Sequence, residues 1–310
     1  MKTLVYGGFC AAFSLLILTV AATTTDTSIV DVEDAEAVDI CHTCVKVDAI
    51  CYNRSYLFEL TAPFRNEVVI KQMGILRDNN VLYYSFEPTL DDPETSKVAY
   101  VPLDNPESST IMSAQQTFNF TTFDINQNDK SIYLGGSDGI WVLKNADTSA
   151  PILKFVNSKG EKITSVVSKD YVYFSKENFR GVVKDKDGVF DILLDDRVIK
   201  NFVLDKDVEY TVVYLHATGL YAFNSKTKEQ VRLSINPFFR GLTVDLDGVM
   251  YAWHVYGIYK VRLDGDMKHS KLTKVSDLEV GAMTFDNLNN IIYSKDKSLY
   301  RLTKTNTTKC

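Results

Sequence analysis

Residues 239–263, FFRGLTVDLDGVMYAWHVYGIYKVR, contain the clearest copy of a unit that recurs along the chain. The apolar runs at 241–244, 249–253 and 257–263 each have the composition of a β-strand, and the last run alternates between apolar and polar residues. Asp247-Gly248 separates the first two runs with residues that tolerate the positive φ of a tight turn. A second turn at 264–265 leads to an outer strand near 270–273. The stretch therefore predicts one four-stranded antiparallel sheet.

The same unit occurs in five more places, for example as FTTFD at 120–124 and GAMTFD at 281–286, each followed by two further apolar runs. The centres of the six third strands lie 38 to 41 residues apart, at Tyr100, Trp141, Val182, Tyr221, Tyr259 and Tyr300. A repeat of about forty residues with four strands is typical of a propeller blade. A β-sandwich, or two small β domains, would have less even spacing. We therefore predict an all-β fold, a six-bladed β-propeller of four-stranded antiparallel blades.

The start of the chain predicts secretion. Residues 1–22 combine Lys2, an apolar run and a small-residue end at Val20-Ala21-Ala22, which is the pattern of a signal peptide. Residues 23–40 are Thr-rich and then acidic, and we expect a disordered leader there. The propeller is expected over 41–310, with blades at roughly 61–112, 113–155, 156–196, 197–235, 236–275 and 276–310, and with ring closure by residues 51–60. The mature protein is predicted to be extracellular.

Four cysteines remain after removal of the signal peptide, namely Cys41, Cys44, Cys51 and Cys310. An even number in an oxidising compartment predicts two disulfides, and a bridge from Cys310 to an amino-terminal cysteine would secure the closure of the ring. The pairing has three possible forms, and the sequence does not choose among them. The C-x-x-C spacing of Cys41 and Cys44 also fits a zinc or redox site, but a second ligand pair and a βαβ setting are missing. Glycosylation sequons begin at Asn53, Asn119 and Asn306.

Charge and motifs limit the possible functions. The net charge is −6, and the basic residues are scattered, so neither nucleic acid nor an anionic membrane is an expected partner. The sequence has no nucleophile elbow, no HExxH motif and no phosphate-binding glycine loop, and its four histidines lack metal-like spacing. We therefore predict a monomeric binding protein, not an enzyme, without metal or cofactor. The enzymatic alternative is a calcium-dependent lactonase or esterase of the propeller type.

Candidate binding residues lie in the loops that join the second and third strands of a blade and in those between blades, because both kinds emerge on one face. These loops contain aromatic, basic and histidine side chains that suit a planar, partly anionic small molecule. The residues predicted to bind it are Arg240, His216, His254, Tyr256, Phe239 and Phe118. Arg240 would pair with an acidic group, Tyr256 and Phe239 would stack, and the histidines would form hydrogen bonds. The simpler interpretation is that the phenylalanines fill space between blades.

The chain resembles the ommochrome-binding proteins of insect haemolymph and their relatives. The resemblance rests on residues 80–86 (NVLYYSF), 97–101 (KVAYV), 133–140 (YLGGSDGI), 218–221 (TGLY), 292–294 (IYS) and 299–302 (LYRL). It implies a protein of haemolymph that carries a tryptophan-derived phenoxazinone pigment without covalent attachment. Residues 249–265 also resemble the YWTD propeller repeats of lipoprotein-receptor ectodomains, which implies an extracellular protein-binding module as a further alternative.

Overall fold

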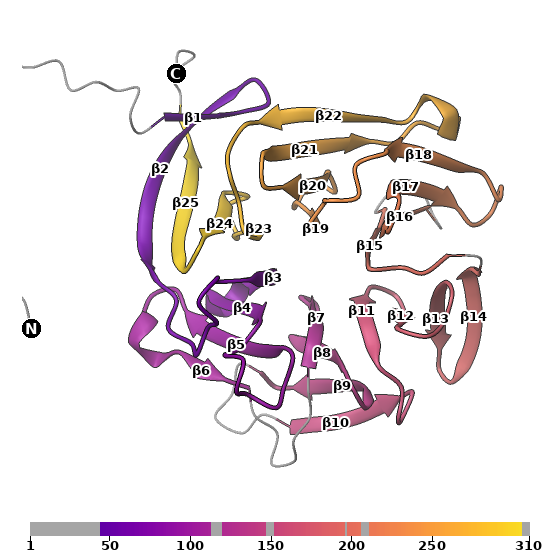
Figure 1. Cartoon of the computed structure of the whole chain (residues 1–310), viewed down its shortest axis with the longest axis horizontal. Helices are drawn as coiled ribbons and strands as arrows, with labels where there is room; N and C mark the ends of the chain where they lie inside the picture. Colours follow the sequence, from indigo (N-terminus) through magenta and orange to yellow (C-terminus); the bar gives the residue numbers. More distant parts are fainter. Residues whose placement is uncertain (1–43, 113–119, 147–151, 196, 206–210, 306–310) are drawn as a thin grey trace, which may run out of the picture. The chain divides into compact units, whose positions relative to one another are not determined.

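The repeating unit folds as a four-stranded antiparallel sheet, and the described part of the chain forms six such sheets around a common centre (Figure 1). The structure is a computed structural model that describes residues 44–112, 120–146, 152–195, 197–205 and 211–305. The innermost strand is the first strand of each repeat, and the following strands lie progressively farther out. The prediction of an all-β, six-bladed β-propeller is confirmed.

The strands of the blades follow one another along the chain. The first blade contains β3 (Ile70–Leu76), β4 (Val81–Phe86), β5 (Lys97–Pro102) and β6 (Thr110–Ile111), and the second contains β7 (Phe120–Asn126), β8 (Ser131–Gly136), β9 (Gly139–Lys144) and β10 (Ile152–Asn157). The third contains β11 (Ile163–Ser168), β12 (Val172–Lys176), β13 (Val182–Lys186) and β14 (Val189–Leu194), and the fourth contains β15 (Asn201–Leu204), β16 (Thr211–His216), β17 (Gly219–Asn224) and β18 (Gln230–Ser234). The fifth contains β19 (Gly241–Val244), β20 (Met250–His254), β21 (Gly257–Arg262) and β22 (Lys271–Ser276). Short 3-10 helices, η2 (Arg77–Asn79), η3 (Pro106–Ser108) and η4 (Met267–His269), lie in the connections.

The sixth blade is built from both ends of the described chain. Its inner strands are β23 (Met283–Phe285), β24 (Ile291–Lys295) and β25 (Ser298–Lys304), and its outer strand is β2 (Ile50–Glu59), which pairs antiparallel with β25. A further strand, β1 (Cys44–Val47), pairs with the outer edge of β2. Pairing of an early strand with a late one holds both ends of the described chain in one blade and so closes the ring.

The hydrophobic core lies between neighbouring blades. For example, Val213 and Leu220 of the fourth blade share one buried cluster with Leu242 and Met250 of the fifth. A single blade can bury its two faces only against its neighbours, and this requirement explains why apolar residues occupy both faces of the middle strands. Packing between the blades leaves the centre of the ring lined by the six inner strands.

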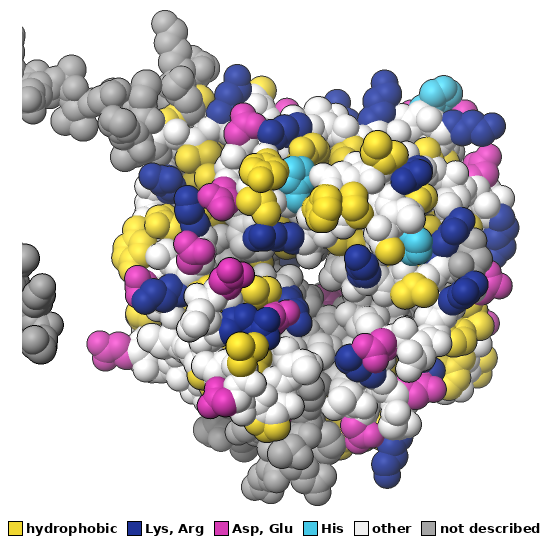
Figure 2. Space-filling view, viewed as in Figure 1, with side chains coloured by type: hydrophobic (Ala, Val, Ile, Leu, Met, Phe, Trp, Pro, Cys, Tyr) yellow, Lys and Arg dark blue, Asp and Glu magenta, His cyan; other side chains and the backbone are white. Residues whose placement is uncertain are grey.

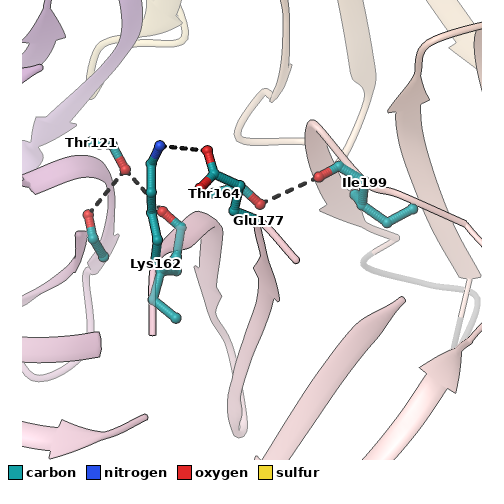
Figure 3. Close-up of polar contacts among 7 residues, drawn as sticks. Thr121, Lys162, Thr164, Glu177 and Ile199 are labelled. Atoms are coloured by element: carbon teal, nitrogen blue, oxygen red, sulfur yellow. Dashed lines mark hydrogen bonds and ion pairs between the residues drawn. The ribbon is translucent and has the colours of Figure 1, made fainter. Parts of the chain in front are cut away.

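Polar contacts also join neighbouring inner strands. Thr121 Oγ1 in β7 donates to the carbonyl of Ile163 in β11 at 2.9 Å, and Thr164 Oγ1 in β11 lies 3.3 Å from the carbonyl of Ile199, which precedes β15 (Figure 3). An ion pair between Lys162 and Glu177 lies beside these contacts. Each threonine satisfies a carbonyl of the next blade, so the contacts fix the angle between blades.

One of the four cysteines does not form the disulfide that the sequence predicted. Cys44 is disulfide-bonded, but Cys51, which we had included among the disulfide candidates, is a buried free thiol in β2. Its side chain packs inside the closing sheet, where a small apolar group is favoured. Cys41 and Cys310 lie outside the described residues.

A thiol count tests the state of Cys51. Unfolded wild-type protein should contain one more reactive thiol than unfolded Cys51→Ala, whereas the two native proteins should react equally, because burial protects the thiol. The measurement is Ellman titration with and without denaturant. One thiol fewer in the unfolded wild type than in the unfolded variant would show that Cys51 forms a disulfide, because the substitution would then free its partner cysteine.

The remaining sequence-based predictions concern the glycosylation sequons, the signal peptide and the leader. Asn53 is exposed in β2 and could accept a glycan without displacing the core. Asn119 and Asn306, the predicted signal peptide and the leader lie outside the described residues. Within the described residues no helix has the length and apolarity needed to cross a membrane.

Candidate functional site

One face of the ring carries the predicted binding residues. Antiparallel strands place the loop between the second and third strands on the same face as the connection to the next blade. His216, Phe239, Arg240, His254 and Tyr256 all belong to such loops or to the strand ends beside them, and Phe118 lies outside the described residues. We call this face the loop face. Figure 2 shows hydrophobic side chains gathered beside a histidine over the blade of β19–β22, with basic side chains around the central opening.

Three of the predicted residues come together on the fifth blade. The ring centroids of Phe239 and His254 lie 5.3 Å apart with the planes at 74°, and those of His254 and Tyr256 lie 5.9 Å apart. Phe239 also meets Tyr259 edge to face at 5.3 Å. Edge-to-face pairs of this kind are favourable, so the cluster is a rigid base for the turn that carries Tyr256.

His254 is occupied by contacts within the protein. Its Nδ1 accepts the backbone N–H of Tyr256 at 3.0 Å, and its Nε2 lies 2.8 Å from the hydroxyl of Tyr259. The first contact requires an unprotonated Nδ1, so the ring is the neutral tautomer with hydrogen on Nε2. Burial, followed by the charges of Lys274 and Arg240, lowers the pKa of His254. The structure therefore favours a positioning role for His254 over the predicted hydrogen bond to a ligand.

The exposed aromatic residue next to Arg240 is Phe238, not Phe239. Phe239 is only 9 % exposed and packs into the cluster, whereas Phe238 is 77 % exposed and Tyr256 is 74 % exposed. The chain turns at Pro237-Phe238, where the N–H of Phe238 donates to Asn236 Oδ1, and this turn leaves the Phe238 ring in solvent while Phe239 packs inward. Arg240 is also exposed. We call Phe238, Arg240 and Tyr256 the aromatic surface.

His216 lies on the fourth blade and contacts residues of that blade. Its Nδ1 is 2.8 Å from Thr218 Oγ1, which in turn lies 2.8 Å from the hydroxyl of Tyr221. Arg232 Nη2 donates to the carbonyl of Thr218 at 2.7 Å, and its guanidinium lies 5.7 Å from the Tyr221 ring centroid. This second group of aromatic and basic residues thus lies on the blade next to the aromatic surface.

A cavity of about 440 Å³ occupies the centre of the ring. All six inner strands contribute to its wall, and it reaches the turns between first and second strands, on the side opposite the loop face. None of the five predicted binding residues that the structure describes lines it. Two charged residues that the sequence analysis did not select, Arg77 and Asp124, do line it.

Neither the aromatic surface nor the central cavity brings metal ligands together among the described residues. Among the described residues, no group of three or more His, Cys, Asp or Glu side chains is arranged to hold a metal ion. In the central cavity, the carboxylate of Asp245 is used by its own turn, where Oδ1 accepts the backbone N–H groups of Asp247 and Val249. The carboxylates of the cavity are therefore dispersed, and one of them serves the backbone.

The sequence comparisons link the chain to one named relative. It is 24 % identical over 248 residues to the ommochrome-binding protein of Manduca sexta, and the alignment covers 74 % of this chain and 82 % of that protein. No protein-family model matches the chain. At this identity the likeness supports a distant relationship to a binding propeller.

Solved structures share the fold. A gluconolactonase of Xanthomonas campestris superposes with a TM-score of 0.58 at 11 % identity, covering 84 % of this chain and 97 % of that chain. A chain of the nidogen/laminin complex superposes with a TM-score of 0.51 at 13 % identity, covering 73 % of this chain and 90 % of that chain. An enzyme and a component of a protein complex thus have the same architecture, and fold likeness does not choose between their functions.

Proposed function

We propose that this protein is a secreted, non-enzymatic binding protein that sequesters or carries a small planar aromatic ligand of the ommochrome type. The observation that carries the proposal is the relationship to the ommochrome-binding protein of Manduca sexta. The predicted signal peptide supports secretion, and the name of the relative supports the ligand class. Binding without turnover requires only shape, stacking and ionic contacts.

The aromatic surface supplies the groups that such a ligand needs. Tyr256 and Phe238 present exposed rings on which a planar molecule can stack, and exposed Arg240 can pair with an acidic substituent. His254 holds the turn of Tyr256 through the Nδ1 contact, so the ring of Tyr256 is presented by a rigid support. Pre-organised aromatic side chains bind at a low entropic cost.

The first test uses xanthommatin as the probe. We expect the native protein to shift the visible absorption band of the pigment, and the shift to disappear on unfolding. Failure of the purified protein to take up xanthommatin would contradict the proposed ligand class.

Tyr256→Ala and Arg240→Ala should each weaken xanthommatin binding by about five- to tenfold. Loss of one stacking contact or one exposed ionic contact costs about 1 kcal/mol. Only the effect of Arg240→Ala should shrink at high salt, because salt screens exposed charges. The matched controls are Tyr56→Ala and Arg262→Ala, which remove exposed side chains from the outer strand β2 and from β21. If both test variants bind xanthommatin as tightly as the wild type, the pigment does not bind at the aromatic surface.

A protein partner is the second candidate. Ile235 and Phe238, in one connection of the loop face, are 76 % and 77 % exposed, and Tyr256 on the same face is 74 % exposed. Exposed apolar groups that share a face are typical of interaction surfaces. The two candidates differ in their response to pigment, since a surface for a protein partner need not bind xanthommatin at all. The lactonase alternative requires calcium ligands in the centre of the ring, and it predicts stoichiometric calcium binding by calorimetry.

A further inference from the structure

Two charged side chains that line the central cavity have no counter-charge among the residues that the structure describes. The volume of the cavity, about 440 Å³, falls within the range of about 300–1,000 Å³ that is usual for small-molecule sites. Arg77 and Asp124 line it from neighbouring blades. Both groups are partly buried, and a buried charge is costly unless something pairs with it.

Arg77 follows β3 directly, at the start of η2. Its backbone N–H donates to Gln127 Oε1 at 3.1 Å, and Gln127 Nε2 donates to the carbonyl of Ile75 at 2.7 Å, so the start of η2 is fixed against the second blade. The Nε of Arg77 is buried without a hydrogen-bond partner, and its side chain forms no ion pair with a described residue. Burial alone lowers the pKa of this guanidinium.

Asp124 lies in β7, the inner strand of the second blade. Its Oδ2 accepts the backbone N–H of Ser168 at 2.6 Å, across the boundary with the third blade. Burial is the main cause that raises the pKa of Asp124 to about 6, and only hydrogen bonds from backbone N–H groups oppose it. No described cation pairs with this carboxylate.

The remaining charged residues of the cavity wall already have partners. Lys71 pairs with Glu87 at 3.1 Å, Lys169 Nζ donates to the carbonyl of Asp205 at 2.7 Å, and Asp245 accepts the N–H groups of its own turn. Arg77 and Asp124 thus provide one positive and one negative group that have no ion-pair partner among the described residues. The rest of the wall is mixed. It includes polar residues such as Gln72, Ser165 and Thr243, and aromatic residues such as Phe123 and Phe202, whose side chains are almost fully buried.

We propose that the central cavity binds an α-amino acid or a close zwitterionic derivative. Arg77 would pair with the carboxylate, and Asp124 would pair with the ammonium group. This proposal is independent of the aromatic surface, because Phe238, Arg240 and Tyr256 do not line the cavity. Either binding proposal can be wrong while the other holds.

The test uses L-phenylalanine and two analogues that each lack one charge. Isothermal titration calorimetry should detect binding of L-phenylalanine to the full mature protein, and weaker binding of both 3-phenylpropionate and phenethylamine. Arg77→Met should weaken L-phenylalanine and 3-phenylpropionate by at least about tenfold and leave phenethylamine unchanged. Asp124→Asn should weaken L-phenylalanine and phenethylamine by a similar factor and leave 3-phenylpropionate unchanged.

The controls are Arg262→Met and Asp91→Asn, which change the same charges at exposed positions outside the cavity wall. They should leave all three affinities as in the wild type. No heat of binding for L-phenylalanine at millimolar concentration would overturn the proposal, and so would equal losses for the three ligands in both cavity variants. If Arg77→Met fails to fold, Asp124→Asn still tests the proposal, because it should lose affinity for phenethylamine and keep its affinity for 3-phenylpropionate. Xanthommatin uptake is measured separately and tests only the aromatic surface.

Discussion

Gly219→Ala should lower the free energy of unfolding by about 3 to 4 kcal/mol. Gly219 begins β17 with φ at +137°, a conformation that side chains rarely adopt. A Cβ at this position would lie 2.0 Å from the carbonyl oxygen of Ser234 in the neighbouring strand β18. The expected loss combines about 1–2 kcal/mol for the strained backbone with about 1–3 kcal/mol for the displaced carbonyl.

The close approach follows from a bulge that recurs around the ring. In the fourth blade the pairing of β17 with β18 shifts between Leu220 and Tyr221, and the last part of β18 bends over the start of β17. The fifth blade repeats the arrangement, with a shift after Ile258 and a Cβ on Gly257 that would lie 2.3 Å from the carbonyl of Ser276. A bulge increases local twist, so the glycine permits the twist that closes the ring.

Gly160→Ala is the matched control. Gly160 also has a positive φ, at +76°, but a Cβ there would meet nothing within 4 Å. Its substitution should cost only about 1 kcal/mol, because the strain of the backbone is the sole penalty. Urea unfolding of both variants at one pH measures the difference. A loss at Gly219 no larger than that at Gly160 would show that the bulge can relax at little cost.

The fold was predictable because the sequence repeats its strand pattern evenly. Every residue that marked a third strand, from Tyr100 to Tyr300, lies in the third strand of its blade. Tyr214 stacks on Tyr221, and Tyr293 stacks on Tyr300, with centroids at 5.5 and 5.2 Å, so the marker residues contribute to blade packing. Periodicity captures such contacts because they recur at fixed positions of the unit.

The site was less predictable, because its residues depart from the repeat. The repeat aligns Phe123-Asp124 with Phe285-Asp286, but the two aspartates have different places in the structure. In the structure the turn residue of the second blade is Asn126, whose Oδ1 accepts the N–H of Asn128, as Asp286 Oδ1 accepts the N–H of Leu288. Asp124 therefore lies two residues earlier, in the wall of the cavity. A local register difference of this kind is invisible to a pattern of apolar residues.

The sequence also could not show which of Phe238 and Phe239 is exposed. Both are phenylalanines and suit a stacking role. Only the direction of each side chain makes one ring exposed and the other buried. Likewise, the sequence shows that His254 is close to Tyr256, but not that its Nδ1 accepts the N–H of Tyr256. Composition pointed to this loop, and only its geometry shows which ring is exposed and which groups are already hydrogen-bonded.

Asp124→Asn should make the protein more stable at neutral pH, by up to about 3 kcal/mol. The pKa of Asp124 rises from 3.8 to about 6 on folding, mainly because the carboxyl is buried, and each pKa unit corresponds to about 1.4 kcal/mol. The folded protein therefore binds the proton more tightly than the unfolded chain. The stability that this provides is fully present below about pH 3.8 and is lost as the pH rises through about 6. Asparagine is neutral at every pH and can still accept the N–H of Ser168.

The size of the gain should depend on pH, and this separates two roles for the carboxylate. If Asp124 is kept for a ligand, its charge destabilises the empty cavity, and the advantage of Asp124→Asn should grow from pH 4.5 to pH 8 in urea unfolding. Asp91→Asn, the exposed control, should show little such trend. If Asp124 serves only to join β7 to Ser168, loss of a charge-assisted hydrogen bond should instead make the variant less stable at pH 8. A stabilised variant that no longer binds phenethylamine would show that this residue lowers stability in exchange for recognition.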